Sequence, residues 1–272
     1  MKKLALLAFP AVCLIPACAI PGDAAWSDLH ANGYGSLYNL NASGSVNDVS
    51  VSSAPVSISG DLSIKENSDT NFLGGARVGF APMEVSMSMF NHKSVHNGAF
   101  VGDFDMGTGT SFSGTSDADT TLDFEVTKLM LGFDMMNTGL FRIGLLFGVD
   151  MVTFNEFSVT ATKGGTTLPP YDIASDEEIP IPMVGVRGDL LLPEGFRVGA
   201  EVSGVSADID DIDGTFLDID AQIGWTPMDN EWVEVLIGYR MMSFDFKGEL
   251  DGTSVDAEVD FDGFYWGVGI TF

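Results

Sequence analysis

The segment 91–97, Asn-His-Lys-Ser-Val-His-Asn, contains the residue types that come closest to a catalytic arrangement. It holds two of the three histidines, and His92 is separated from Ser94 by one residue. An imidazole beside a hydroxyl can activate a serine nucleophile. No acid is placed to orient the histidine, and alternating polar residues at a strand end are also typical of a polar rim. We therefore predict no catalytic residues, and a hydrolase built on His92 and Ser94 is the alternative.

The acidic run 208–214, Asp-Ile-Asp-Asp-Ile-Asp-Gly, invites comparison with a calcium loop. If Gly214 is the loop glycine, the first ligand position falls on Ile209, which offers no oxygen, so the EF-hand pattern fails. Further acids gather at 172–178 and 256–262. A weak divalent-cation site at an acidic rim and a solvated negative surface both explain them, and we favour the solvated surface. The sequence predicts no metal site and no cofactor.

The first 19 residues have the pattern of a secretory signal peptide. Met1-Lys2-Lys3 is followed by an apolar run from Leu4 to Ile15 and by Ala17-Cys18-Ala19, which predicts cleavage after Ala19. The alternative is a lipobox that would leave Cys18 as a lipidated N-terminus. Both cysteines, Cys13 and Cys18, lie in this segment, so residues 20–272, predicted to form a single domain, contain no thiol.

The bulk composition excludes several classes of protein. The formal charge is −27, and it becomes −29 without Lys2 and Lys3, which argues against nucleic acid as a partner. At the same time 45% of the residues are hydrophobic, so the chain is not disordered by charge. Beyond the leader there is no run of about 18 apolar residues, which a transmembrane helix would need.

Alternating apolar and polar residues predict ten strands, near 31–43, 71–80, 84–97, 120–136, 140–160, 179–192, 196–209, 215–226, 232–249 and 256–272. Connections at 81–83, 137–139, 193–195 and 226–231 are short. Connections at 44–70, 98–119 and 161–178 are long and polar, although 44–70 can also pair as a hairpin. Short and long connections alternate, except that those at 210–214 and 250–255 are short as well, and this pattern is typical of an antiparallel up-and-down transmembrane β-barrel.

All five arginines lie on the strand face opposite the apolar stripe. An arginine that faces lipid near the midplane costs about 2–4 kcal/mol, so five would cost about 10–20 kcal/mol, as much as a whole domain gains by folding. The arginines must therefore point into the lumen, where acids of the same phase can pair with them. The predicted lumen charge network comprises Arg77, Glu84, Asp134, Arg142, Asp150, Arg187, Asp189, Arg197, Glu201, Glu234 and Arg240.

Two hairpins predict particular ion pairs. Three-residue loops at 137–139 and 193–195, with glycine in the left-handed position, would place Asp134 opposite Arg142 and Arg187 opposite Glu201. We expect both to be cross-strand pairs in the lumen. Between Leu122 and Leu131 the apolar stripe changes phase, which predicts either a bulge or an apolar patch inside the barrel mouth. Aromatic girdles are expected at one end at Trp225, Trp232, Phe141 and Phe272 and, at the other end, at Phe154 and Phe157.

The last strand carries five large apolar residues at every second position: Phe264, Trp266, Val268, Ile270 and Phe272. With the leader and the strand pattern, it makes the chain resemble small bacterial outer-membrane β-barrel proteins over nearly all of residues 20–272. The resemblance implies that these five residues are the signal read by the barrel-assembly machinery. It also implies a location in the bacterial outer membrane, with outer-membrane lipid as a partner and both barrel termini on the periplasmic side.

The expected role is structural, surface interaction or limited solute passage through a lumen filled by charges. The His-x-Ser of 92–94 is similar to that of outer-membrane lipid A deacylases. The alternative is therefore an outer-membrane lipid-modifying hydrolase. Omptin proteases use Asp-Asp and Asp-His pairs; neither His92 nor His96 follows an aspartate by two residues, which argues against that class. A soluble or tethered β-sandwich that binds a ligand is the remaining alternative.

Overall fold

The computed structural model describes residues 30–53, 56–105, 111–167, 170–174, 177–209, 212–227, 232–250 and 253–271. The predicted signal peptide with Cys18, and Phe272 of the predicted assembly signal, lie outside these ranges. No helix in the described ranges is long and apolar enough to cross a membrane.

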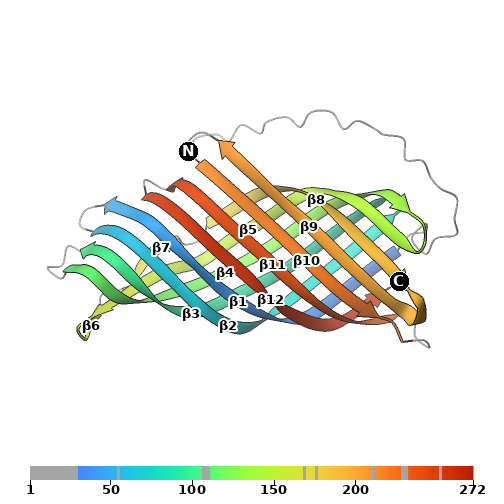
Figure 1. Ribbon diagram of the computed structural model, residues 1–272, viewed down its shortest axis with the longest axis horizontal. Helices are drawn as coiled ribbons and strands as arrows, with labels where there is room; N and C mark the ends of the chain where they lie inside the picture. The colour runs from blue at the N-terminus through green and yellow to red at the C-terminus, as the bar shows by residue number, and fades with distance from the viewer. Residues whose placement is uncertain are drawn as a thin grey trace.

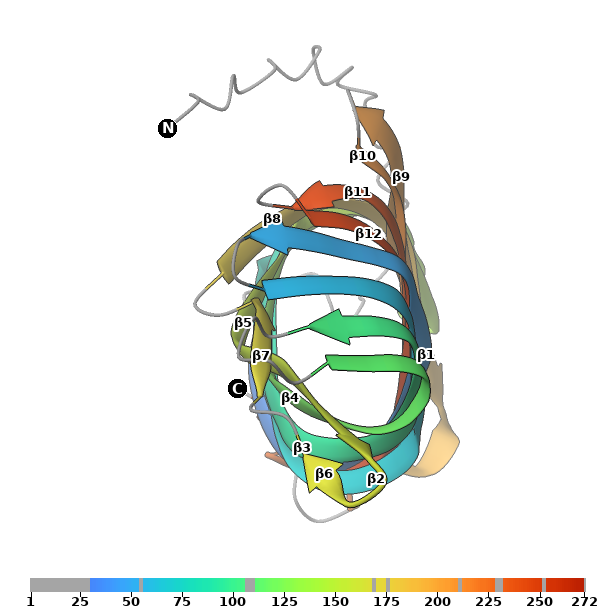
Figure 2. The same cartoon turned by 90° about the vertical axis from the view of Figure 1, so that its left-hand side faces the viewer.

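Ten long antiparallel strands form a closed wall (Figures 1 and 2). They are β1 (His30–Ser53), β2 (Val56–Phe80), β3 (Met83–Asp105), β4 (Ser111–Asn137), β5 (Phe141–Lys163), β8 (Glu177–Leu192), β9 (Phe196–Ile209), β10 (Ile212–Trp225), β11 (Val233–Leu250) and β12 (Thr253–Thr271). Two short strands, β6 (Thr166–Thr167) and β7 (Tyr171–Ala174), pair with β5. Because β12 also pairs with β1, the predicted ten-stranded barrel is confirmed and the β-sandwich alternative is wrong.

Tight turns collect at one end of the barrel, which we call the proximal end; the opposite end is distal. They include Ala81–Pro82 between β2 and β3 and the 3-10 turn η1 (Pro193–Gly195) between β8 and β9. Gly195 has a φ of 79°, the left-handed conformation that the loop requires. Asn32 pairs with Thr271, so the first and last described residues of the chain lie at this same end.

The segments 44–70 and 98–119 are mostly strand, so their assignment as loops is wrong. The hairpin left open for 44–70 forms, with Val46 opposite Leu62. The strands β3 and β4 likewise stay paired as far as Phe100↔Ser116 and beyond. These stretches are rich in Ser, Thr, Gly and Asp because one face of each strand meets solvent, whereas inward side chains such as Leu62 and Phe100 are buried.

The polarity of the wall inverts part-way along the barrel. On β12 the outward side chains from Phe264 to Ile270 are large and apolar, with exposures of 67% at Phe264 and 62% at Trp266, whereas Asp262 and Asp260 continue the same face distally. The inward residues invert in the opposite sense, from charged to apolar. The proximal half therefore has an apolar outside and a charged lumen, and the distal half has a polar outside and an apolar lumen.

The phase change on β4 is this inversion. Inward burial alternates without a break from Leu122 to Met130, so β4 has no bulge there and the apolar patch inside the mouth is confirmed. The extra residue lies on β5, where Asp123 pairs with Glu156 and Phe124 with Phe154.

Because of that extra residue, Phe154 and Phe157 both pack against the apolar core of the lumen. The predicted outer aromatic girdle at these two positions is therefore wrong. Trp225 and Trp232, at the proximal end, are exposed with relative areas of 41% and 58%.

Candidate functional site: the layered lumen

The proximal lumen is crossed by a cluster of ion pairs centred on Glu84. Arg142 donates from Nη1 to Glu84 Oε2 over 2.8 Å, and from Nε and Nη2 to Asp189 Oδ2 over 3.1 and 2.7 Å. Arg187 donates to Glu84 Oε1 and, over 2.7 Å, to Asp134 Oδ1. These five residues come from β3, β4, β5 and β8, so the cluster ties four strands together across the interior.

The cluster continues towards the remaining strands. Arg197 donates to both carboxylate oxygens of Glu234 over 2.9 and 3.0 Å and to Asp189 over 3.3 Å. His30 lies 3.0 Å from Glu84 through its Nε2 atom. Both additions bring β1, β9 and β11 into one network of charge-assisted hydrogen bonds, the geometry in which buried charges are stabilised.

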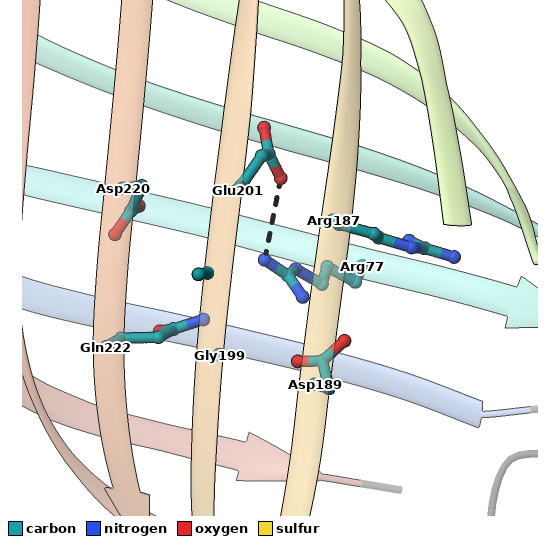
Figure 3. Close-up of a pocket in the computed structure, with 8 residues that line it drawn as sticks. Arg77, Arg187, Asp189, Gly199, Glu201, Asp220 and Gln222 are labelled. Atoms are coloured by element: carbon teal, nitrogen blue, oxygen red, sulfur yellow. Dashed lines mark ion pairs between the residues drawn. The ribbon is translucent and has the colours of Figure 1, made fainter. Parts of the chain in front are cut away.

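A second cluster lies on the distal side of the first and is centred on Asp218. Arg240 reaches its two carboxylate oxygens over 3.0 and 2.8 Å, and Lys128 reaches Oδ2 over 2.7 Å. Lys128 also lies 2.7 Å from Glu201, which in turn lies 3.9 Å from Arg77. Arg77 projects between Glu201 and Asp189 beside a cavity of only about 10 Å³ (Figure 3), the space of a single water molecule.

Long side chains fill the lumen partly because glycines on neighbouring strands make room for them. A Cβ atom added to Gly224 would collide with the Glu234 carboxylate, and one added to Gly238 would collide with the ring of Tyr265. A second small space of about 20 Å³ lies between Arg77, Lys128 and Arg240. The charged side chains and the inward glycines thus close this level of the barrel together.

All five arginines face inward as predicted. Of the two predicted ion pairs, Asp134–Arg142 forms, although not in the predicted register, and Arg187–Glu201 does not form. Asp134 comes opposite Gly144, because a register shift at Met135 and a turn closed by the Thr138 N–H to Phe141 O bond displace the hairpin. Its carboxylate still approaches Arg142, but only to 4.0 Å.

Arg187 does lie opposite Glu201, as the turn at 193–195 predicts. Neither residue pairs with the other, because Arg187 reaches across the lumen to Glu84 and Asp134 while Glu201 accepts from Lys128. Proximity along the ladder was therefore a weaker guide than charge balance across the interior. Lys128 was not among the predicted lumen charges, although it lies on the same face of its strand as Asp134 and could have been predicted from that.

Asp150 differs from the other acids of the network. It is fully buried, and neither carboxylate oxygen has a hydrogen-bond partner among the described residues. It lies opposite Lys128 on the neighbouring strand, but the Lys128 ammonium points towards Asp218 and Glu201 instead. Asp150 marks the boundary between the charged lumen and the apolar one.

Aromatic rings begin immediately above this boundary. Phe90 packs edge-on against Tyr38 with centroids 5.7 Å apart and against Phe124 at 6.0 Å, and Phe124 lies 4.8 Å from Phe261. The guanidinium carbon of Arg240 lies 5.3 Å from the centre of the Phe90 ring, which joins the two layers by a cation–π contact. The rings close the distal lumen by apolar packing, as the ion pairs close the proximal one.

The histidine–serine segment lies inside this apolar layer. Ser94 Oγ is 2.6 Å from His96 Nε2 and 3.2 Å from His92 Nε2, and Asn71 Nδ2 is 3.3 Å from His92 Nδ1. The side chains of His92, Ser94 and His96 all point into the lumen and are buried. Burial, together with the neighbouring His96, lowers the pKa of His92 to about 4, so the ring is neutral at pH 7. The segment thus contains a serine–imidazole hydrogen bond, but this bond lies inside the lumen and not on the outer face of the wall.

The described residues of the predicted assembly signal all point outward. Phe264, Trp266, Val268 and Ile270 form one apolar stripe on β12, and each is more than 45% exposed. Nothing in the structure tests their role in assembly. No group of three or more His, Cys, Asp or Glu side chains in the described ranges is arranged to hold a metal ion.

Comparison with known proteins identifies the fold. No protein-family model matches the chain, and no curated protein matches it either. The crystal structure of the outer-membrane protease OmpT from Escherichia coli matches with a TM-score of 0.54 and 14% identity, over 89% of this chain and 96% of that one. The toluene transporter TodX from Pseudomonas putida matches with a TM-score of 0.33 and 8% identity, over 88% and 89%. The chain has the fold of an outer-membrane β-barrel.

Proposed function

We propose that this protein is an outer-membrane β-barrel whose lumen is closed, with a structural or surface-interaction role and at most limited solute passage. The proximal half lies in the membrane with lipid against its apolar outside. The distal half stands in the external medium, and both termini are periplasmic. A signal peptide directs export, and the barrel-assembly machinery reads the apolar residues of β12 from Phe264 to Ile270 together with Phe272, which follows the strand in the sequence.

The observation that supports this proposal is the coincidence of two boundaries. The outward apolar band and the inward charges occupy the same proximal half, for example Phe264 to Ile270 outside and Glu234 and Arg240 inside. Five arginines at that level are tolerable only in a lumen, and the ion pairs leave spaces of about 10 and 20 Å³ there. Spaces of this size hold a single water molecule, which supports a lumen closed to larger solutes unless these side chains rearrange.

Conductance in planar lipid bilayers tests the proposal. The purified full-length barrel is expected to show no steady openings, and a Lys93→Ala variant, changed on the exposed distal wall, is expected to be equally silent. A double variant, Glu84→Ala with Arg187→Ala, removes the centre of the proximal cluster and should produce openings. Steady large openings in the unaltered protein would contradict a closed lumen.

A lipid-modifying hydrolase remains the second candidate because Ser94 Oγ and His96 Nε2 are 2.6 Å apart. We propose that the protein is not an enzyme, since these side chains are buried in the lumen while the acyl chains of lipids lie outside the wall. Analysis of lipid A acyl chains should give the same result for the unaltered protein and for Ser94→Ala. Loss of an acyl-chain product in that variant would establish the hydrolase instead.

The similarity to OmpT does not lead us to propose a protease, since 14% identity supports the fold alone. As partners we propose outer-membrane lipid and, weakly, divalent cations held by the acids of the distal wall. The exposed Glu258 and Asp260 on β12 are examples of these acids. Heat-modifiable migration in detergent gels is expected for the membrane barrel.

A further inference from the structure

The distal wall is not paired throughout: β8 and β9 separate part-way along. The strand β8 pairs with β5 over its length, as far as Phe154↔Glu177, but with β9 only as far as Val184↔Gly204. Beyond that pair β9 continues to Ile209 along β10. Within the described ranges, no strand pairs with the other edge of β9 over 205–209. The distal ends of β9 and β10 project beyond the rest of the wall (Figure 2).

Two prolines explain where the pairing stops. The Leu191 N–H donates to Leu140 O on the β5 side, so odd-numbered residues of β8 direct their N–H groups to β5 and even-numbered residues direct theirs to β9. Continuing the register would bring Pro182 opposite Ser206 and Pro180 opposite Asp208. Proline has no N–H to give, so the ladder ends at the last residue that has one, Val184.

The opposite edge of the opening is not blocked in this way. On β9 the even-numbered residues face β8, as the pair Val184↔Gly204 shows, so Ser206 and Asp208 direct their backbone N–H and C=O groups into the opening. Neither residue is proline or glycine. An extended chain laid along this edge would find donors and acceptors in the spacing of a strand, which is how peptides add to exposed sheet edges.

The opening also uncovers the apolar lumen. Side chains of the distal core on β1 to β4, such as Leu40 and Phe90, are almost completely buried. In contrast, Ile181 and Val205, which border the opening, are only partly buried, although Met183 and Phe216 beside them are buried. An inserted strand would therefore have apolar contacts on its inner face.

The sequence around the opening is strongly acidic. The segments 172–178 and 208–213 together contain eight acids, and no Lys or Arg occurs between 164 and 186 or between 198 and 239. Of these acids, Glu178 and Asp213 are exposed in the described part of the chain, so a partner entering here meets negative charge outside and apolar side chains inside. Since successive side chains of a strand point to opposite faces, an occupant that alternates basic and apolar residues satisfies both.

We propose that the edge of β9 at Ser206 and Asp208 binds an extended basic peptide strand, with its apolar side chains towards Ile181 and Val205 and its basic side chains towards the acidic rim. The β8 edge cannot compete for this strand because of Pro180 and Pro182. This inference rests on the proposed function only for the side of the membrane on which the peptide arrives.

Fluorescence anisotropy in zwitterionic micelles tests the proposal with the full-length barrel and a labelled peptide of about eight alternating Val and Lys residues. Binding is expected, and methylation of every second peptide nitrogen should abolish it. Ser206→Pro removes one N–H from the opening without touching the β10 ladder, and it should weaken binding about tenfold. Ser206→Ala keeps that N–H and should bind like the unaltered protein.

A second variant approaches the same edge from the other side. Pro180→Val with Pro182→Val restores the missing donors, so β8 should pair with β9, protect the amides of Ser206 and Asp208 from hydrogen exchange, and exclude the peptide. If Ser206→Pro and the Pro180→Val, Pro182→Val double variant both bind the peptide as well as the unaltered protein does, binding is due to charge attraction alone and the proposal is overturned. Absence of binding, or a dimer of this protein that Ser206→Pro dissociates, would overturn it too. Conductance is a separate measurement, so a silent barrel that binds no peptide would leave the proposed function standing.

Discussion

The proximal and distal halves of the barrel are built from the same strands but bury opposite kinds of side chain. In the proximal half Arg142 and Glu84 are inside and Val268 is outside, whereas in the distal half Phe124 is inside and Asp260 is outside. On β4 and β12 the alternation of inward and outward side chains continues through both halves. Strand geometry therefore decides which residues share a face, and the medium outside the wall decides whether that face is apolar.

The two halves also differ in what holds the interior together. The aromatic layer gains free energy from burial of apolar area, and each contact contributes modestly and without strong direction. The charged layer gains from a few directional bonds, and each charge depends on its partners being present. Loss of one partner should therefore be costlier in the proximal lumen than a change of similar size on the distal surface.

The largest effect is expected for Arg142→Met. Among the described residues, the change leaves the carboxylate of Asp189 with Arg197 as its remaining hydrogen-bonded arginine, and it weakens the neutralisation of Glu84. The expected cost is about 3–5 kcal/mol in the free energy of unfolding. Urea unfolding of the barrel in detergent or bilayers measures it. The matched control is Lys93→Ala, which breaks the exposed ion pair with Asp123 and should cost less than about 1 kcal/mol.

A triple variant separates charge from packing at the same place. Arg142→Met with Glu84→Gln and Asp189→Asn removes the charges together, so much of the loss seen in Arg142→Met should be recovered. If the triple variant is no more stable than the single one, the contribution of Arg142 is the volume that it fills, and the contrast between the two lumen layers disappears.

A smaller effect is expected for an arginine placed on the outside of the wall at two heights. Val268→Arg puts the charge in the proposed lipid band and should cost about 2–4 kcal/mol, whereas Asp260→Arg, on the same face of β12, should change stability by about 0.5 kcal/mol or less. Unfolding in lipid bilayers measures both. Equal costs at the two positions would mean that the apolar band does not meet lipid.

Alternation along the strands was enough to predict the barrel, its ten wall strands and the inward direction of all five arginines. The parity of residues such as Arg187 and Arg240 depends only on local geometry, which a single strand specifies. The predicted turn at 193–195 also gave the correct register of β8 and β9, since Gly195 adopts the left-handed conformation that the turn needs.

The ion-pair partners could not be obtained in the same way. They depend on which side chains meet across the lumen, and Arg187 pairs with Glu84 and Asp134, which come from other strands. The long strands were missed for a different reason. The distal segments have solvent on their outer face, so their composition is that of loops, and only the inward residues, Leu62 and Phe100 among them, indicate a strand.

The smallest effect concerns pH and is expected from the distal layer. His92 is enclosed by Asn71 from β2, Phe124 from β4 and its neighbours Ser94 and His96, with Asp69 and Asp123 as the nearest acids. Its pKa is about 4 in the folded barrel, against about 6.5 for an exposed histidine. As the pH falls below about 6.5, the unfolded chain takes up the proton first, so stability declines until the folded-state pKa is reached.

Between pH 7.5 and 5 the unaltered barrel should therefore lose on the order of 1 kcal/mol more stability than His92→Gln, in which this group does not titrate. Urea midpoints at the two pH values measure the difference, and the variant corrects for every other group that titrates in the same range. Parallel decline of the two proteins would show that water reaches the ring in the folded state. The distal lumen would then be wet, and its contrast with the ion-paired proximal lumen would rest on charge alone.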